Sequence, residues 1–222
     1  MRKLKNVLRA SSCCTFSILM CLPAAGQNAW SEADCVTLLD STSVTVQPNG
    51  SGSFAVYKSF KVQTPKGAVN NHVIKYDYDP LTAFARFKQV TVQRANGGTM
   101  QVDVTKTCDY AAPARAIYWG ARQIMLELGR LEPGDVVSYE ISKKGFTYAL
   151  LAGAEDDDAR FIPPMRGQFY DIVPFWVNEP TRRKVYVVSM PMEKELQFQF
   201  YNGACTSSMR YEDGRKVYTF AV

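Results

Sequence analysis

The sequence predicts an all-β fold, an antiparallel β-sandwich of about a dozen short strands. Three observations predict it. Turn residues such as Gly, Pro and Asn recur between short runs rich in Val, Thr, Phe and Tyr, which favour strands. Several runs alternate apolar and polar residues, as strands do when they bury only one face. No segment repeats at a period of roughly 20–50 residues, which argues against a propeller or a solenoid.

Residues 1–26 have the order of a secretory signal peptide. Residues 1–9 carry four basic side chains and no acid, residues 10–22 are uncharged and mostly apolar, and Ala24-Ala25-Gly26 offers small residues before a cut at Gln27. The apolar core is shorter than the roughly 20 residues that a membrane span needs. We therefore expect an exported protein, in the periplasm or at the cell surface, with one domain over residues 27–222 and no membrane span.

The excess of positive charge lies in this leader. The whole chain has 26 basic and 21 acidic residues, and removing the four bases of the leader leaves 22 basic against 21 acidic residues. A nearly neutral chain has no electrostatic reason to bind nucleic acid, so we expect no nucleic-acid partner.

Strand-like runs and turn signals alternate over the rest of the chain. The runs expected to form strands are residues 35–47, 53–63, 72–78, 88–106, 123–129, 135–141, 146–151, 181–190, 195–201 and 210–222. Turn clusters separate them, for example at residues 48–52, at residues 64–67 and at Pro133-Gly134. Residues 79–87 have helical spacing, and we expect a helical turn there that leads into the next strand.

The clearest hairpin lies within residues 88–106. A two-residue Asn96-Gly97 loop would pair Val92 with Gln101 and set an apolar side chain against a polar one. A three-residue loop, Asn96-Gly97-Gly98, pairs Val92 with Val102 instead. Because side chains alternate between the faces of a strand, we predict the three-residue loop, with a glycine bulge.

Three stretches carry a family resemblance. They are VTVQRANGGTMQVDV at residues 90–104, LGRLEPGDVVSYEIS at residues 128–142, and residues 169–191, where an aromatic run and Glu179-Pro180 precede KVYVVSMP. In this order and spacing they resemble the bacterial DUF3857 domain over most of residues 35–222.

The resemblance implies a non-catalytic β-sandwich of immunoglobulin-like type. Such domains typically follow a signal peptide and precede a transglutaminase-like core with a papain-type Cys-His-Asp site, so a transglutaminase-like domain in the same polypeptide is the expected partner. The family has no assigned ligand or catalytic residues, and none is carried over. The sequence stops where that core would begin, so either an N-terminal fragment or a stand-alone member is expected.

The residues themselves also argue against an enzyme. A thiol hydrolase needs a thiolate and a base within hydrogen-bond reach. The single histidine, His72, precedes Cys108 and Cys205, which is not the Cys-His-Asp order, and Cys35 has no helix signal to lower its pKa. We predict no catalytic residues. A Cys108–Cys205 disulfide is one alternative for the thiols, and small buried thiols are the favoured one.

No metal and no cofactor are predicted. Three of the six cysteines lie in the leader, and the three scattered cysteines that remain do not make a zinc site with the one histidine. The acidic run at residues 155–158 offers oxygens to calcium but lacks the spacing and the glycine of an EF-hand. A solvated acidic loop is the favoured interpretation.

Aromatic pairs are the remaining candidates for a site. Tyr118-Trp119 and Phe175-Trp176 lie in irregular segments near prolines. Exposed, these side chains would stack on sugars or anchor a protein partner; buried, they would fill the core. The leading hypothesis is therefore a non-catalytic interaction or accessory module. The alternative is a carbohydrate-binding module that uses Tyr118, Trp119, Phe175 and Trp176 against a glycan.

Overall fold

The structure, a computed structural model, describes residues 30–112, 120–147, 167–175 and 177–222. After a helical turn at residues 30–32, eleven strands, the short helix α2 and one 3-10 turn follow one another within these residues. They are β1 (Cys35–Val46), β2 (Gly52–Val62), α2 (Pro65–Asn70), β3 (Val73–Tyr78), β4 (Ala83–Gln93), β5 (Thr99–Gln101), η1 (Val104–Lys106), β6 (Cys108–Ala111), β7 (Arg122–Glu127), β8 (Val136–Gly145), β9 (Lys184–Pro191), β10 (Thr206–Glu212) and β11 (Arg215–Ala221). The expected signal peptide lies outside the described residues.

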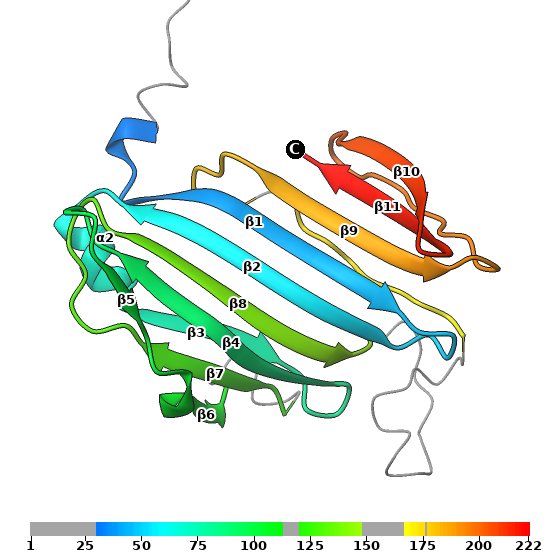
Figure 1. Cartoon of the computed structure of the whole chain (residues 1–222), viewed down its shortest axis with the longest axis horizontal. Helices are drawn as coiled ribbons and strands as arrows, with labels where there is room; N and C mark the ends of the chain where they lie inside the picture. The colour runs from blue at the N-terminus through cyan, green and yellow to red at the C-terminus, as the bar shows by residue number, and fades with distance from the viewer. Residues whose placement is uncertain (1–29, 113–119, 148–166, 176) are drawn as a thin grey trace, which may run out of the picture.

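Two sheets confirm the predicted all-β sandwich. The larger has the strand order β10-β11-β9-β1-β2-β8-β4-β5, and the smaller has the order β3-β7-β6 and lies behind the β8–β4 half of the larger one (Figure 1). Among the described strands every pair is antiparallel except β1 with β9. β1 and β2 match the expected runs closely, whereas β8 extends four residues beyond its expected end, to Gly145. No helix in the described part is long and apolar enough to cross a membrane.

Both hydrophobic cores lie on one face of the larger sheet. On β2 the alternating residues Phe54, Val56, Phe60 and Val62 point inward. Phe60 and Val62 pack under the smaller sheet in the first core, whereas Phe54 joins a second core under β1, β9 and β11. Irregular segments rather than strands cover this second core. We call this core-bearing side the inner face.

A helix occupies the place of one predicted turn. Residues 64–67 were expected to form a turn, which is wrong, because α2 begins at Pro65. The Thr64 hydroxyl accepts a hydrogen bond from the Gly67 N–H at 3.0 Å, and Pro65 fills the first helical position, where a missing N–H costs nothing. Of the helical spacing expected over residues 79–87, a single turn is present, in which the Ala83 N–H donates to the Asp79 carbonyl. The helical interpretation is wrong for residues 83–87, because β4 begins at Ala83.

The predicted hairpin is correct in loop length and wrong in register. Its loop is Ala95-Asn96-Gly97, one residue earlier than predicted, and Val92 pairs with Met100 rather than Val102. Gly97 takes a φ of +90°, and the Arg94 N–H bonds the Gly98 carbonyl at 2.6 Å. The shift of two residues in register keeps apolar side chains opposite each other, so the pattern alone does not distinguish the two loops.

Another strand prediction is wrong. Residues 195–201 alternate apolar and polar side chains, but they pair with no strand in the described part of the chain. They instead run over the inner face of β11, where Leu196 packs against the second core. Their side chains alternate because the segment lies against a sheet, not because the segment is a strand of that sheet.

Candidate functional site

The structure places one of the four predicted aromatic site residues. Tyr118, Trp119 and Trp176 lie outside the described residues. Phe175 is half-buried and packs against the second core. Phe175 therefore contributes to the hydrophobic core. The aromatic face as a whole stays a prediction.

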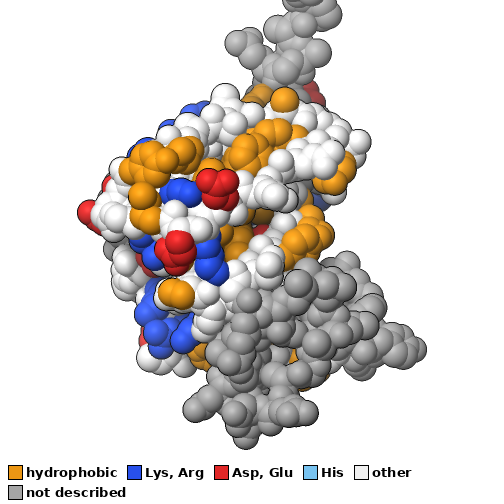
Figure 2. All heavy atoms as spheres, turned by 90° about the vertical axis from the view of Figure 1, so that its right-hand side faces the viewer, with side chains coloured by type: hydrophobic (Ala, Val, Ile, Leu, Met, Phe, Trp, Pro, Cys, Tyr) orange, Lys and Arg blue, Asp and Glu red, His pale blue; other side chains and the backbone are white. Residues whose placement is uncertain are grey.

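A different group of aromatic side chains is exposed beside β11. Phe198 and Phe200 lie 5.5 Å apart, and their ring centroids lie 4.9 and 6.0 Å from that of Phe220, which is buried. Phe198 is 50% exposed and Tyr201 is 75% exposed. We call Phe198, Phe200 and Tyr201 the aromatic patch. Figure 2 views the β9–β11 end and shows hydrophobic side chains there among charged ones.

The aromatic patch has a firm base, because Phe220 pairs in register with Tyr186 of β9. Edge-to-face packing of the rings holds Phe198 and Phe200 in place. Exposed aromatic side chains on a fixed base are typical of protein interfaces. The alternation of residues 195–201 is visible in the sequence. It was interpreted as a strand, and the exposure of the aromatic side chains was therefore not predicted.

Charged and hydroxyl side chains cross the inner face between the two cores. Asp40, Lys58, Tyr139 and Lys184 stand opposite one another in register on β1, β2, β8 and β9. The Lys184 ammonium lies 2.9 Å from the Asp40 carboxylate, and Lys58 lies 3.7 Å from Glu179. We call these five residues the polar row. Its members come from distant parts of the chain, so no local sequence motif marks it.

Three tyrosines have raised pKa values in this part of the molecule: Tyr139 of the polar row and Tyr76 are half-buried, and Tyr186 is buried. Burial raises the pKa of Tyr76 to about 12, with the charge of Asp171 adding to the effect. Burial also raises the pKa of Tyr139 and Tyr186, and the Tyr186 hydroxyl donates to Asp171 at 2.5 Å. These hydroxyls stay protonated at neutral pH. They can donate hydrogen bonds, but they cannot act as bases.

The thiols and the histidine do not come together. Burial raises the pKa of the Cys35 thiol to about 11, and its sulfur accepts a hydrogen bond from the Asn71 amide at 3.2 Å. The exposed His72 ring contacts the Val69 carbonyl. Cys108 and Cys205 are free, so the alternative of a bridge between them is not realised, and of the three described thiols only that of Cys35 is buried. Within the described ranges no group of His, Cys, Asp and Glu side chains is placed to hold a metal ion.

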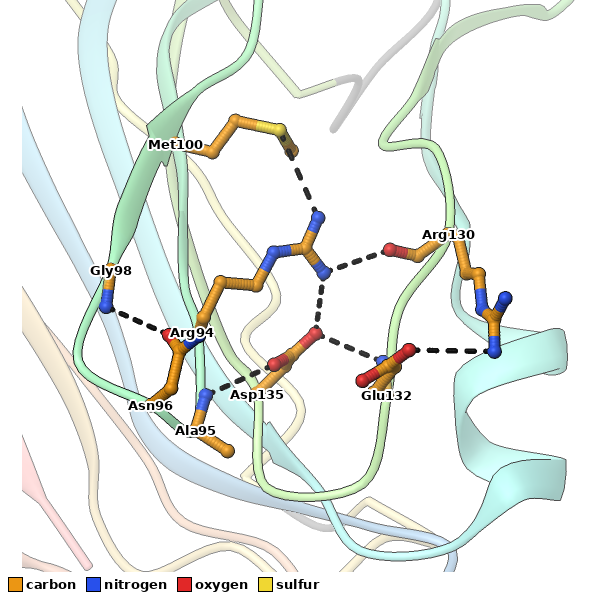
Figure 3. Close-up of polar contacts among 8 residues, drawn as sticks. All are labelled: Arg94, Ala95, Asn96, Gly98, Met100, Arg130, Glu132 and Asp135. Carbon is orange, nitrogen blue, oxygen red and sulfur yellow. Dashed lines mark hydrogen bonds and ion pairs between the residues drawn. The ribbon is translucent and has the colours of Figure 1, made fainter.

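A buried carboxylate joins two of the sequence stretches that carried the resemblance. Asp135 is 1% exposed and accepts hydrogen bonds from Arg94 Nη1 at 2.7 Å, from the Ala95 N–H at 3.2 Å and from the Glu132 N–H at 2.9 Å. Figure 3 shows Arg94 and Asp135 pointing toward each other from neighbouring turns. Arg94 also donates to the Arg130 carbonyl at 2.8 Å. The sequence marked the Pro-Gly turn but not the role of Asp135.

An open groove of about 710 Å³ lies beside this turn. The buried side chains of Ala68 and Leu131 contribute to its walls, and the exposed Val69 lies beside them. Arg130 and Glu132, on its rim, form an exposed ion pair at 3.4 Å. The groove is thus a mostly apolar surface, with an ion pair and Glu127 among its lining residues.

Comparison with known sequences decides the family. Residues 48–222 match DUF3857, described as a domain of unknown function with a solved structure. The chain belongs to the DUF3857 family. Both turns joined by Asp135 lie inside the matched range, whereas β1 lies before it. No curated protein matches this DUF3857 chain.

One solved structure shares the fold, and two others are more distant. A protein from Parabacteroides distasonis, described as a candidate protease, is similar at 15% sequence identity with a TM-score of 0.64, over 85% of the DUF3857 chain and 35% of that protein. An M1 zinc metallopeptidase from Deinococcus radiodurans (TM-score 0.41, 15% identity, 85% of this chain and 39% of that one) is more distant. The CBM3a-L domain of the Clostridium thermocellum cellulosome scaffoldin is also more distant. Its TM-score is 0.33, at 9% identity over 65% of this chain and 97% of that domain.

The first of these likenesses shows the fold alone, because so low an identity does not extend to chemistry. The two TM-scores below 0.5 carry no argument. The DUF3857 chain spans 35% and 39% of the first two of these proteins.

Proposed function

We propose that this DUF3857 domain is a non-catalytic accessory module of an exported protein. In this proposal it docks a transglutaminase-like domain of the same polypeptide through the aromatic patch. The observation that carries the proposal is the exposure of Phe198 and Phe200, which pack on the buried Phe220, and of Tyr201 next to Phe200 in the chain. Leaving large aromatic surface in water is unfavourable, and a partner that covers it gains binding energy.

Two further observations support the proposal. The Parabacteroides distasonis protein of the same fold is about three times as long as the region that matches, so this fold occurs beside other domains. The buried groups of the inner face favour their neutral forms: the thiol of Cys35 and the hydroxyl of Tyr76 have raised pKa values. Such groups suit a framework that positions a partner better than they suit nucleophilic chemistry.

The test begins with the reading frame beyond Val222. We expect it to encode a transglutaminase-like domain. That domain, produced separately, should bind the DUF3857 domain in isothermal titration calorimetry. The variants Phe198→Ala and Tyr201→Ala should each weaken binding about tenfold or more, as central aromatic contacts do.

Val69→Ala is the matched control, because Val69 is a 68% exposed apolar side chain on α2, away from β11. It should leave the affinity unchanged. A reading frame without such a domain overturns the proposal, and so does binding that is insensitive to Phe198→Ala and Tyr201→Ala.

The carbohydrate-binding alternative depends chiefly on Trp119 and Trp176, which lie outside the described residues. Tryptophan fluorescence titrated with a glycan panel separates it from domain docking. A saturable shift with one glycan class, lost in Trp119→Ala or Trp176→Ala, would replace the docking proposal; no shift with any glycan would remove the alternative.

A further inference from the structure

Among the described strands, the one at the end of the larger sheet has an open edge. β10 pairs there with β11 alone, and all seven of its residues are exposed. An edge strand presents unpaired N–H and C=O groups, which are a template for another strand. The opposite end of the sheet is the three-residue β5, which offers a much shorter template.

The hydrogen bonds of β11 fix which groups of β10 are free. Lys184 and Val222 exchange two backbone hydrogen bonds, each 3.0 Å long, so Val222 directs its backbone toward β9. Backbone direction alternates along an antiparallel strand, so Ala221 directs its backbone toward β10, where it pairs with Thr206. Continuing the alternation, the free N–H and C=O groups of β10 belong to its odd-numbered residues: Ser207, Met209 and Tyr211.

The same residues carry apolar surface on the inner face. Met209 stands opposite Tyr218, and Tyr211 stands opposite Lys216. Met209 is 47% exposed and Tyr211 is 63% exposed. The charged side chains of β10, Arg210 and Glu212, point to the other face, where they pair with each other at 2.8 Å.

The strand is complementary to itself. A two-fold axis through Met209 sets it opposite the partner's Met209 and sets Tyr211 opposite the partner's Ser207. Both are pairs of residues with free backbone groups, as an antiparallel ladder requires. On the charged face Arg210 meets the partner's Ser208, and Glu212 meets the partner's Thr206, so no like charges face each other.

With the axis at Arg210, odd-numbered residues with free backbone groups still face each other. The two Arg210 guanidinium groups, however, lie directly opposite each other, which is unfavourable. An axis at Tyr211 runs the strands into the turn at Asp213-Gly214 and shortens the ladder. An axis at Ser208 also shortens the ladder, because β10 begins at Thr206. Charge and ladder length together thus favour the register centred on Met209.

We propose that β10 pairs antiparallel with β10 of a second copy of this chain, about a two-fold axis at Met209. The pairing joins two eight-stranded sheets and covers Met209 and Tyr211. It uses the strand edge rather than the aromatic patch, so it stands independently of the docking proposal. A seven-residue edge is small beside the roughly 800 Å² per partner of stable interfaces, so the dimer should be concentration-dependent.

The test measures mass by sedimentation equilibrium over a dilution series of the mature chain. The unsubstituted chain should dimerise at the upper end of the series. Met209→Lys and Met209→Glu each set like charges against each other at the axis, so each variant alone should be monomeric. An equimolar mixture of the two sets lysine against glutamate and should recover the dimer.

Val69→Lys and Val69→Glu make the same charge changes on α2 and should leave the dimer intact. Far-UV circular dichroism of each variant checks that the fold is kept. The proposal is overturned by a chain that stays monomeric throughout, by Met209 variants that each remain dimeric, or by a mixture of them that stays monomeric.

Discussion

The guanidinium of Arg94 lies 2.7 Å from the carboxylate of Asp135, across two turns that are 41 residues apart in the sequence. The carboxylate side chain is 2% exposed, whereas Arg94 is 30% exposed. Asp135 therefore serves as a clamp: it holds the β4–β5 loop through the Ala95 N–H and its own turn through the Glu132 N–H. Both turns precede or follow long strands of the larger sheet, so the clamp fixes one end of the first core.

Replacing Asp135 should be strongly destabilising. In Asp135→Asn the Arg94 charge loses its partner, and the new amide presents donors toward backbone donors. Breaking a buried ion pair in this way costs about 3 kcal/mol of unfolding free energy. Urea denaturation measures the loss. Glu132→Gln, which breaks the exposed Arg130 pair, should change stability by less than about 0.5 kcal/mol. Equal effects of the two variants would contradict the clamp.

Gly67→Ala separates two opposed effects. Alanine is favoured over glycine inside a helix by about 1 kcal/mol. A Cβ at Gly67, however, would lie 2.1 Å from the Asp34 carbonyl oxygen and 3.0 Å from the Cys35 sulfur. The contact is with backbone that leads into β1, so we expect net destabilisation and a lower Tm. A comparison of Val69→Ala with Val69→Gly, at a 68% exposed position of the same helix, measures the propensity effect alone. A Gly67→Ala variant with a raised Tm would show that α2 moves freely away from β1.

The Asp40–Lys184 pair should be coupled energetically. Their side chains are 20% and 12% exposed and lie 2.9 Å apart. A double-mutant cycle with Asp40→Asn and Lys184→Met should give a coupling of about 1–2 kcal/mol that resists added salt. The control cycle uses Asp34 and Lys66, whose side chains are 36% and 75% exposed, and should show no salt-resistant coupling. Equal coupling energies in the two cycles would mean that the Asp40–Lys184 pair is no stronger than an exposed ion pair.

Stability should fall at alkaline pH. Burial raises the pKa of Cys35 from 9.0 to about 11 and that of Tyr76 from 10.0 to about 12, and it raises those of Tyr139 and Tyr186 as well. The folded chain therefore holds protons that the unfolded chain releases. Stability is complete below about pH 9 and is lost as the pH rises toward the folded-state values.

Urea midpoints measured between about pH 8 and pH 11 test this expectation. Cys35→Ala and Tyr76→Phe should each flatten the decline, because each removes one retained proton. Val62→Ala damages the same core beside Cys35 without removing a titratable group, so it should lower the midpoint and keep the slope. A midpoint independent of pH would contradict the buried, neutral state of these groups.

The sequence predicts the sheets better than the connections. Alternation along β2 and β4 identified the strands, because a strand with one buried face must alternate. The same rule misassigned residues 195–201, since a segment that lies on a sheet also turns every second side chain toward it. At residues 64–67 the Thr-Pro pair served as a helix start, and the turn interpretation missed the hydroxyl cap.

The candidate surfaces were harder to predict. The polar row joins Asp40 to Lys184, and the clamp joins Arg94 to Asp135; each pair depends on strand or turn neighbours that are far apart in the sequence. The register of strand pairing decides which side chains meet. The Val92–Met100 pair shows that the alternation of apolar and polar residues does not distinguish registers that differ by two residues. Predicting such contacts requires knowledge of the sheet order.

The parallel pairing of β1 with β9 has a consequence for how the chain folds. Asp40 and Lys184 are 144 residues apart, so the second edge of β1 is closed only after most of the chain has been made. At a synthesis rate of about 5–20 residues per second the wait is roughly 7–30 s. During that time the β1–β2 hairpin offers an open ladder to any other nascent chain. Slow, late closure of this kind makes folding yield, rather than final stability, the property most sensitive to temperature and to chaperones that bind exposed strands.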